Sequence, residues 1–421
     1  MTVLNLLLFS TVVWITRGMY DPSIVILLPC FLIWVWRVTL NRPGFVFEER
    51  LWNGLPWFWA ILVAVRINVQ FFSPEWAFLG NALGAIPFVL LILDFRTQQR
   101  KWIFPVLMTE LFFLTLYLSP HPTIDVFQSN TLAVDYFLGG LNPYRGSYPD
   151  IYHGHYDYRP GFLYFPGALL LQTASHLLFD DIRGVLVLAW GSACFFLRKS
   201  STNFWIWMTV PVLFFQFNQA WLDPVIAFSA ALLLVGLSRK SSWISIAAMV
   251  LAASVKQYGV LLAVFAFFFV GFRRSWKLAF QQGLASAVGF GLILLPFLIS
   301  GAKEFYDMTI ATHATAHIRG DALSVTAFLL RQFDYSLPSG GQAAAIALGF
   351  GIGVWHLARN SKERGLRTLP EAWAIAFGFS ILFGKFAFCN YYGLLMSFWI
   401  LAEIWDGVTI PSEPETLQPS T

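Results

Sequence analysis

The longest polar interval of this apolar sequence, residues 119–167, concentrates side chains that could do chemistry. Its first carboxylate, Asp125, follows an apolar run and precedes an amphipathic segment, residues 126–138. A carboxylate placed there could accept a proton from a hydroxyl group. Asp is equally favoured as a helix N-cap, and Asp135, Asp150 and Asp157 are competing carboxylates. A loop of this length with so many tyrosines is more typical of a functional segment than of a disordered one.

Metal binding is an alternative use of the same interval. His153, His155 and Asp157 supply imidazole and carboxylate groups, which are ligands for zinc and manganese. Neighbouring loop histidines also commonly line a polar surface without a metal. No cofactor is firmly predicted, and a divalent metal at these three residues is kept as an alternative.

Several basic residues and histidines that stand apart from the other basic residues could hold an anion. Lys256, Lys385, Arg159 and Arg319 are suited to a phosphate oxygen, because ammonium and guanidinium groups stabilise negative charge. Lysines at helix ends also extend into lipid headgroups without any such role. His313 and His317 stand four residues apart without the adjacent Glu of a zinc-protease motif, so a phosphate or acceptor contact is favoured over metal.

The composition predicts an integral membrane protein. Hydrophobic residues make up 57% of the chain and charged residues only 12%, with a mean hydropathy of +0.63, whereas soluble domains carry about a quarter charged residues. The net charge of +4 does not indicate nucleic-acid binding. Three scattered cysteines favour neither a disulfide framework nor a zinc knuckle.

Apolar runs near the length of a bilayer predict an all-α fold of roughly 12–14 transmembrane helices. The runs lie at residues 1–14, 22–39, 55–72, 77–93, 102–119, 161–179, 184–197, 204–215, 225–238, 243–255, 259–272, 279–300, 341–358, 371–384 and 391–405. We expect one polytopic domain over residues 1–405. It comprises N-terminal spans (1–119), an extracytoplasmic active-site loop (120–167) and the remaining spans (168–405). Residues 406–421 are expected to form a disordered cytoplasmic tail.

Basic clusters between the runs predict the orientation, because Lys and Arg accumulate in cytoplasmic loops. If these clusters are cytoplasmic, the 119–167 loop lies outside the cytoplasm. The clusters stand at residues 37–50, 96–101, 239–240, 273–274 and 359–367. One conflict arises: two full spans between residues 161 and 197 would put Arg198 and Lys199 outside as well. Either one of these two runs is re-entrant or lies along the surface, or the rule fails there.

Short motifs in a fixed order resemble a known superfamily. They are Ile124-Asp125-Val126-Phe127, Gly139-Gly140-Leu141-Asn142-Pro143-Tyr144, Tyr164-Phe165-Pro166-Gly167, Gln219-Ala220-Trp221-Leu222-Asp223, Ser254-Val255-Lys256-Gln257-Tyr258 and Lys385-Phe386-Ala387-Phe388-Cys389-Asn390-Tyr391-Tyr392. Together they resemble the GT-C integral membrane glycosyltransferases that use polyprenyl-phosphate sugars. The resemblance is to the mannosyltransferases of glycosyltransferase family 87 and to the related glycosylphosphatidylinositol mannosyltransferase. This chain has Tyr-Phe-Pro-Gly where the family expects a Tyr-Pro-Pro-like run.

The resemblance implies transfer of a sugar, as in a mannosyltransferase, from a polyprenyl-phosphate donor to a lipid or glycan acceptor by inverting displacement. It implies Asp125 as the base, since a phosphate leaving group needs no protonation. The substrate-binding residues expected on these motifs and on the outer loops are Tyr144, Arg159, Asp223, Lys256, Gln257, His313, His317, Arg319, Lys385, Asn390 and Tyr391. The expected partners are the donor, the acceptor and membrane lipids, with no nucleic acid.

Two functions of other classes compete with this interpretation. A lipid or sugar transporter or flippase predicts polar groups near the midplane and repeated halves, and a noncatalytic assembly subunit predicts tolerance to loss of Asp125. The sequence contains no Asn-x-Ser/Thr glycosylation site. This favours a multi-pass protein of a bacterial plasma (inner) membrane with an extracytoplasmic active site.

Overall fold

The computed structural model describes residues 2–41, 48–65, 85–87, 89, 103–154, 159–198 and 204–405. Within these ranges the chain is all-helical, as predicted, and its one β-type contact is an isolated bridge between Met19 and Ala322. The predicted tail at 406–421 and most of the predicted span at 77–93 lie outside the described residues.

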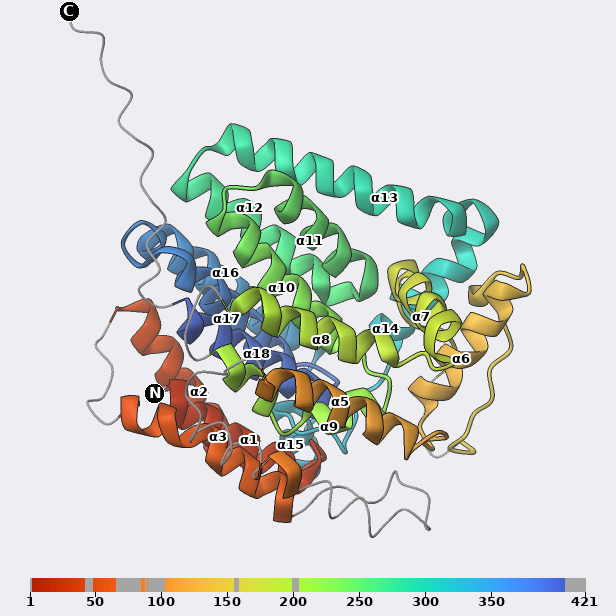
Figure 1. Ribbon diagram of the computed structural model, residues 1–421, viewed down its shortest axis with the longest axis horizontal. Coiled ribbons are helices and arrows are strands. Elements are labelled where there is room, and N and C mark those ends of the chain that lie inside the picture. The colour runs from red at the N-terminus through yellow and green to blue at the C-terminus, as the bar shows by residue number, and fades with distance from the viewer. Residues whose placement is uncertain are drawn as a thin grey trace, which may run out of the picture.

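The helices follow the predicted apolar runs closely (Figure 1). Their bounds are α1 Thr2–Thr16, α2 Ile24–Thr39, α3 Glu48–Val65, α5 Ile103–Tyr117, α6 Asp125–Leu138, α7 Pro166–Phe179, α8 Gly184–Leu197, α9 Leu213–Asn218, α10 Asp223–Ser238, α11 Ser242–Val255, α12 Val260–Arg273, α13 Trp276–Tyr306, α14 Thr312–Thr315, α15 Val325–Phe333, α16 Ser339–Arg364, α17 Thr368–Leu382 and α18 Cys389–Ile404. Shorter turns are η3 Pro143–Arg145, η4 Phe204–Thr209, η5 Gln257–Gly259, the π-helical turn Asp307–Ala311 (η6) and η7 Gly365–Arg367. The predicted span at 204–215 is wrong as one helix, because Pro211 interrupts it between η4 and α9.

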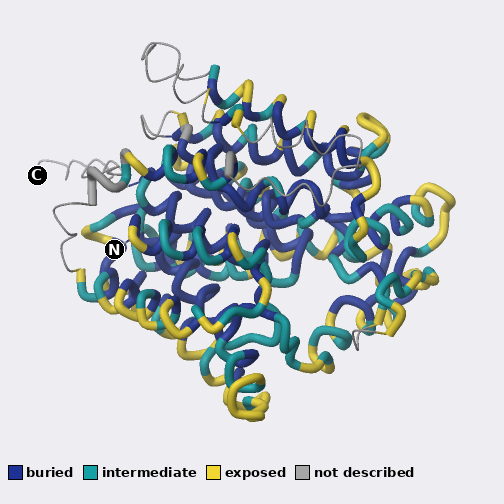
Figure 2. Tube along the Cα trace, turned by 90° about the horizontal axis from the view of Figure 1, so that it is seen from below, coloured by how far each residue is buried: buried dark blue, intermediate teal, exposed yellow. Residues whose placement is uncertain are grey.

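The core of the molecule is formed by helices that are apolar on every side. Nearly every residue of α10, α17 and α18 is buried, which is typical of helices enclosed by other helices. Figure 2 shows this buried interior running through the middle of the bundle.

Two stretches among the described residues, Trp276–Thr315 and Ser339–Leu382, contain helices long and apolar enough to cross a membrane. The first runs from α13 to α14 with a kink at Gly301, and the second comprises α16 and α17, which meet at a turn at Gly365. Along α13 the side chains of Phe280, Leu284, Val288 and Leu292 recur every four residues and are more than half exposed. An exposed apolar stripe of this length suits contact with lipid. Helices such as α10, with 16 residues, and α11, with 14, are about 21–24 Å long against a hydrocarbon core of about 30 Å.

The bundle has two chemically different ends. At the end that we call the Arg273 end, Arg273 donates to the Ser361 carbonyl, Arg274 Nη2 donates to the Leu237 carbonyl at 2.6 Å, and Asn360 Nδ2 donates to the Thr39 carbonyl at 3.2 Å. These bonds join the adjacent ends of α2, α10, α12 and α16. The opposite end, which we call the Asp125 end, carries residues 119–154 and 159–165, Lys256 and residues 307–324 and 383–388.

Helix α7 does not run between these two ends. Its first turn is joined to the end of α11, where Phe165 N donates to the Val255 carbonyl at 3.3 Å. Just beyond its last turn, Arg183 Nη1 donates to the Ser119 carbonyl at 2.9 Å and to the Asn218 carbonyl at 3.2 Å. Both ends of α7 therefore lie at the Asp125 end. Of the alternatives for residues 161–197, this arrangement fits a run that lies along the surface.

Candidate functional site

Asp125 is the first residue of α6. The preceding residue, Ile124, occupies the N-cap position in an extended conformation, so the N-cap alternative for Asp125 is wrong by one residue. Asp125 Oδ1 accepts a hydrogen bond from the Val126 backbone N–H at 2.8 Å and faces the Tyr152 hydroxyl at 3.5 Å. The carboxylate is thus partly buried at a helix start, where negative charge is stabilised. Asp135, on the same helix, is exposed.

A second carboxylate, Asp223, is the first residue of α10 and forms a buried ion pair. Lys256 Nζ lies 2.9 Å from Asp223 Oδ2, and the two side chains are only 4% and 0% exposed. Asn390 Nδ2 donates to the same oxygen at 3.0 Å, and the Tyr258 hydroxyl donates to Oδ1. The Asp223 carboxylate therefore has a donor from each of α18, η5 and the α11–η5 junction.

Three tyrosine rings complete the surroundings of Lys256. The Nζ atom lies 5.3, 5.0 and 5.5 Å from the ring centres of Tyr164, Tyr258 and Tyr391, within the range of cation–π attraction. Burial lowers the pKa of Lys256, and the Asp223 charge opposes that effect. We call Tyr164, Asp223, Lys256, Tyr258, Asn390 and Tyr391 the Lys256 cluster. In this conformation the Lys256 ammonium group is paired with the Asp223 carboxylate.

Tyr164 belongs to both the loop and the Lys256 cluster. Burial raises the pKa of its phenol well above the usual value, and the charges of Tyr391, Asp223 and Asp125 raise it further. The backbone beside Tyr164 is fixed by two predicted substrate-binding residues: Tyr144 Oη donates to the Tyr164 carbonyl and Gln257 Nε2 to the Leu163 carbonyl, each at 2.8 Å. Tyr144 and Gln257 thus hold the loop in place.

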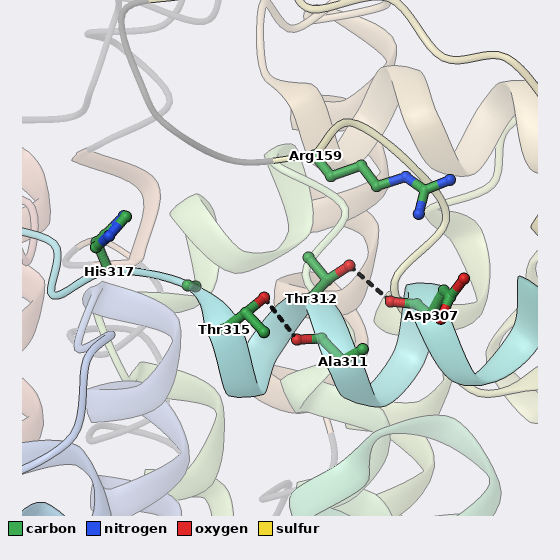
Figure 3. A pocket seen from close by; sticks show the side chains of 7 residues that line it. Arg159, Asp307, Ala311, Thr312, Thr315 and His317 are labelled. Atoms are coloured by element: carbon green, nitrogen blue, oxygen red, sulfur yellow. Dashed lines mark hydrogen bonds between the residues drawn. The ribbon is translucent and has the colours of Figure 1, made fainter.

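A pocket of about 330 Å³ lies next to this loop, which contributes Arg159 to its wall. The lining residues are Arg159, Asp307, Ala311, Thr312, Thr315, Ala316 and His317 (Figure 3). The pocket follows the π-helical turn Asp307–Ala311, where Thr312 Oγ1 donates to the Asp307 carbonyl at 2.8 Å. π-Helical turns are frequent at functional sites.

The pocket combines cations with hydroxyl groups. Arg159 faces it from the loop and is the one Lys or Arg among the lining residues, and a guanidinium group stays positively charged. The wall carboxylate, Asp307, is paired with Lys303 Nζ at 2.6 Å. Guanidinium, imidazole and hydroxyl groups together suit an oxyanion or a polyhydroxylated ligand.

Arg319 and Lys385 lie near each other but make internal contacts. Arg319 N donates to the Lys385 carbonyl at 3.1 Å, and the Arg319 guanidinium pairs with Asp321 at 2.7 Å. Lys385 is partly buried, and its Nζ donates to the Ala314 carbonyl at 2.7 Å. Leu323 N also donates to the Ala387 carbonyl at 2.9 Å, so residues 319–323 are attached to residues 385–387. Ala314 directly precedes the pocket residues Thr315 and Ala316.

His313 and His317 do not share a helix face, because α14 ends at Thr315. His317 lines the pocket. The His313 ring meets the Phe386 ring edge-on, with 6.2 Å between ring centres, and burial lowers its pKa. His313 thus lies on the helix that lines the pocket and packs against residues 385–388.

Several residues of the Lys256 cluster and of the pocket were not predicted from the sequence. Tyr164 and Tyr258 stand inside the motifs quoted above but were not assigned to a site. Asp307, Thr312 and Thr315 were also missed, although a run of polar residues three to five apart in an apolar chain was a usable signal. That run departs from the helical period because of the π turn, which the sequence does not reveal.

The metal alternative involves residues of which the structure describes only one. His155 and Asp157 lie outside the described residues, whereas His153 sits in an exposed turn held by Asp150, whose Oδ2 accepts from Gly154 N at 2.6 Å. In the part of the chain that the structure describes, no three His, Cys, Asp or Glu side chains converge as metal ligands. The metal site stays a prediction.

The sequence matches no protein-family model, and no curated protein and no solved structure matches it significantly.

Proposed function

We propose that the protein is a GT-C-like glycosyltransferase that moves a sugar, such as mannose, from a polyprenyl-phosphate donor to a lipid or glycan acceptor. The observation that carries the proposal is a partly buried carboxylate, Asp125 at the start of α6, on the same loop that contributes Arg159 to a pocket lined by hydroxyl groups and His317. Asp223 is fully buried against Lys256, whereas Asp125 lies at a partly accessible helix start. Asp125 would accept the proton of the acceptor hydroxyl as that oxygen attacks the anomeric carbon.

The donor phosphate would bind in the Arg159 pocket. Arg159 and His317 supply donors for its oxygens, and Thr312 and Thr315 supply hydroxyl groups. The phosphate leaves as an anion, so a permanent positive charge at Arg159 stabilises the charge that develops on the leaving oxygen. The Lys256 cluster would hold Tyr164 in position without contacting the substrate. This role replaces the direct phosphate contact that the sequence predicts for Lys256.

The Asp125 end would face the extracytoplasmic side of a bacterial inner membrane. The support is that the basic pairs of the short helix connections, Arg239-Lys240 and Arg273-Arg274, and the basic residues Arg359 and Lys362 near the end of α16 all lie at the Arg273 end. Basic residues favour the cytoplasmic side. A bundle of roughly 12–14 spans with α7 along the surface is consistent with this orientation.

Asp125→Asn tests the proposed base. The change keeps the size of the side chain and an oxygen that can accept from Val126 N, but removes the proton acceptor. A general base contributes about 10²–10⁴-fold, so sugar transfer from polyprenyl-phosphate mannose should fall by at least about 100-fold. Product formation by purified protein is measured with radiolabelled donor and a set of lipid and glycan acceptors.

Asp135→Asn is the matched control, since Asp135 is exposed on the same helix, and it should retain the parental rate. Equal rates for the parent and Asp125→Asn would overturn the assignment of the base. A parent that forms no glycosidic product but moves the lipid-linked sugar across proteoliposomes would favour the transporter.

A further inference from the structure

The Arg273 end carries a second feature that the proposed reaction does not use. Trp243, at the start of α11, is 83% exposed, and Trp276, at the start of α13, is 43% exposed. Lys240 and Lys277 stand beside them and are exposed as well. The Trp276 ring packs on one side against Phe267 and Phe272 of α12, with 5.7 and 5.3 Å between ring centres, and is exposed on the other. A largely exposed indole and a half-exposed one, each beside an exposed lysine in the sequence, thus stand at this end.

Hydrogen bonds join the two helix connections that carry these residues. Arg274 Nη2, in the α12–α13 turn, donates to the Leu237 carbonyl near the α10–α11 turn at 2.6 Å. Further along α13, Gln282 Nε2 donates to Ser242 Oγ at 2.9 Å. These two bonds join the α10–α11 connection to the α12–α13 connection. Lys240 and Trp243 belong to the first connection and its helix start, and Trp276 and Lys277 begin α13.

The exposed stripe of α13 starts at this same surface. Phe280 follows Trp276 by one turn and is 64% exposed, and Leu284 follows Phe280 and is 68% exposed. Indole rings prefer the level of the lipid headgroups, and basic residues near a membrane surface attract anionic lipids. A lipid phosphate at the lysines would place its acyl chains along Phe280 and Leu284.

We propose that Lys240, Trp243, Trp276 and Lys277 form a binding site for the headgroup of an anionic phospholipid, with the acyl chains along α13. The site is separate from the proposed catalytic site, which lies at the other end of α13. The same surface should discriminate against zwitterionic lipids, because their choline or ethanolamine group cancels the phosphate charge that the two lysines recognise.

The test compares lipid retention by the full-length protein in nanodiscs. Phosphatidylglycerol or phosphatidylcholine is added to a neutral background, and native mass spectrometry counts the lipids that remain bound. The parent should retain phosphatidylglycerol in preference. Lys240→Gln with Lys277→Gln should weaken that retention about 30-fold, because each basic residue near the surface contributes about 1 kcal/mol.

The control removes two charges from the Asp125 end, through Lys303→Gln and Arg331→Gln, both at exposed positions. It should keep the parental preference, and all three proteins should elute alike in size-exclusion chromatography. Equal retention of the two lipids by the parent, or equal loss in the test and control variants, would overturn the proposed site.

Discussion

The buried ion pair of Lys256 and Asp223 makes a sharp prediction for stability. Removing one partner of a buried pair costs about 3–5 kcal/mol, because the other charge stays buried without its counterion. In Lys256→Met, Asp223 keeps its bonds from Tyr258 and Asn390, so we expect a loss of about 3 kcal/mol. In Asp223→Asn the ammonium keeps only the tyrosine rings and a neutral amide, so we expect the upper part of that range.

The double variant Lys256→Met with Asp223→Asn removes both charges together. The amide oxygen introduced at position 223 can still accept from Tyr258, and the remaining loss is that of ordinary hydrogen bonds, about 1–3 kcal/mol. The double variant should therefore be more stable than Asp223→Asn alone. Fraction folded is followed by circular dichroism as SDS is titrated into dodecylmaltoside micelles.

The chain supplies its own control, the Lys303–Asp307 pair, which is even shorter at 2.6 Å but has a lysine side chain that is 83% exposed. Lys303→Met should scarcely move the SDS midpoint, because solvent screens an exposed pair. If the losses of the two single variants at Lys256 and Asp223 simply add in the double variant, the two charges are not coupled. The structural role assigned to the Lys256 cluster would then be wrong.

Two further predictions concern packing and orientation. Gly167→Ala should lower the thermal midpoint, because the new Cβ would lie 2.7 Å from the Ser254 carbonyl oxygen and overpacking costs about 1–3 kcal/mol; Gly351→Ala, where nothing lies within 4 Å, should be neutral or stabilising. Cysteines at the exposed positions Ser147 and Lys362 test the orientation with an impermeant maleimide on intact cells. Only the cysteine at position 147 should be labelled, and labelling of both to the same extent would contradict the proposed sidedness.

Helix positions could be predicted from the sequence because long apolar runs are the strongest local signal. The run at 184–197 matches α8 to the residue, and the amphipathic segment 126–138 became α6, which begins at Asp125. The break at Pro211 was readable in principle, since proline interrupts helices. The number of spans does not follow from run lengths alone, because α7 is apolar enough to pass for a span although both of its ends lie at the Asp125 end.

The contacts within the candidate site could not be predicted from the sequence. Asp223, Lys256 and Asn390 were singled out by residue type and motif, but nothing in the sequence indicated that they bond to one another, since 33 residues separate the first two and 167 separate Asp223 from Asn390. Which cation remains available to a ligand depends on such pairings. Lys256 is satisfied by Asp223, whereas Arg159 faces a pocket, and side-chain type alone does not distinguish the two.

The charged groups of the proposed site lie where helices begin, end or change period. Asp125 and Asp223 are the first residues of α6 and α10, and the positive end of a helix stabilises a carboxylate there. Lys256 follows the last residue of α11, and the pocket follows a π turn. Backbone outside regular helices is tolerated at membrane depth only where protein or a water-filled cavity surrounds it. An apolar bundle can therefore carry charged chemistry at its helix termini while its helix middles stay apolar, which explains why the polar interval and the distant short motifs meet at one end.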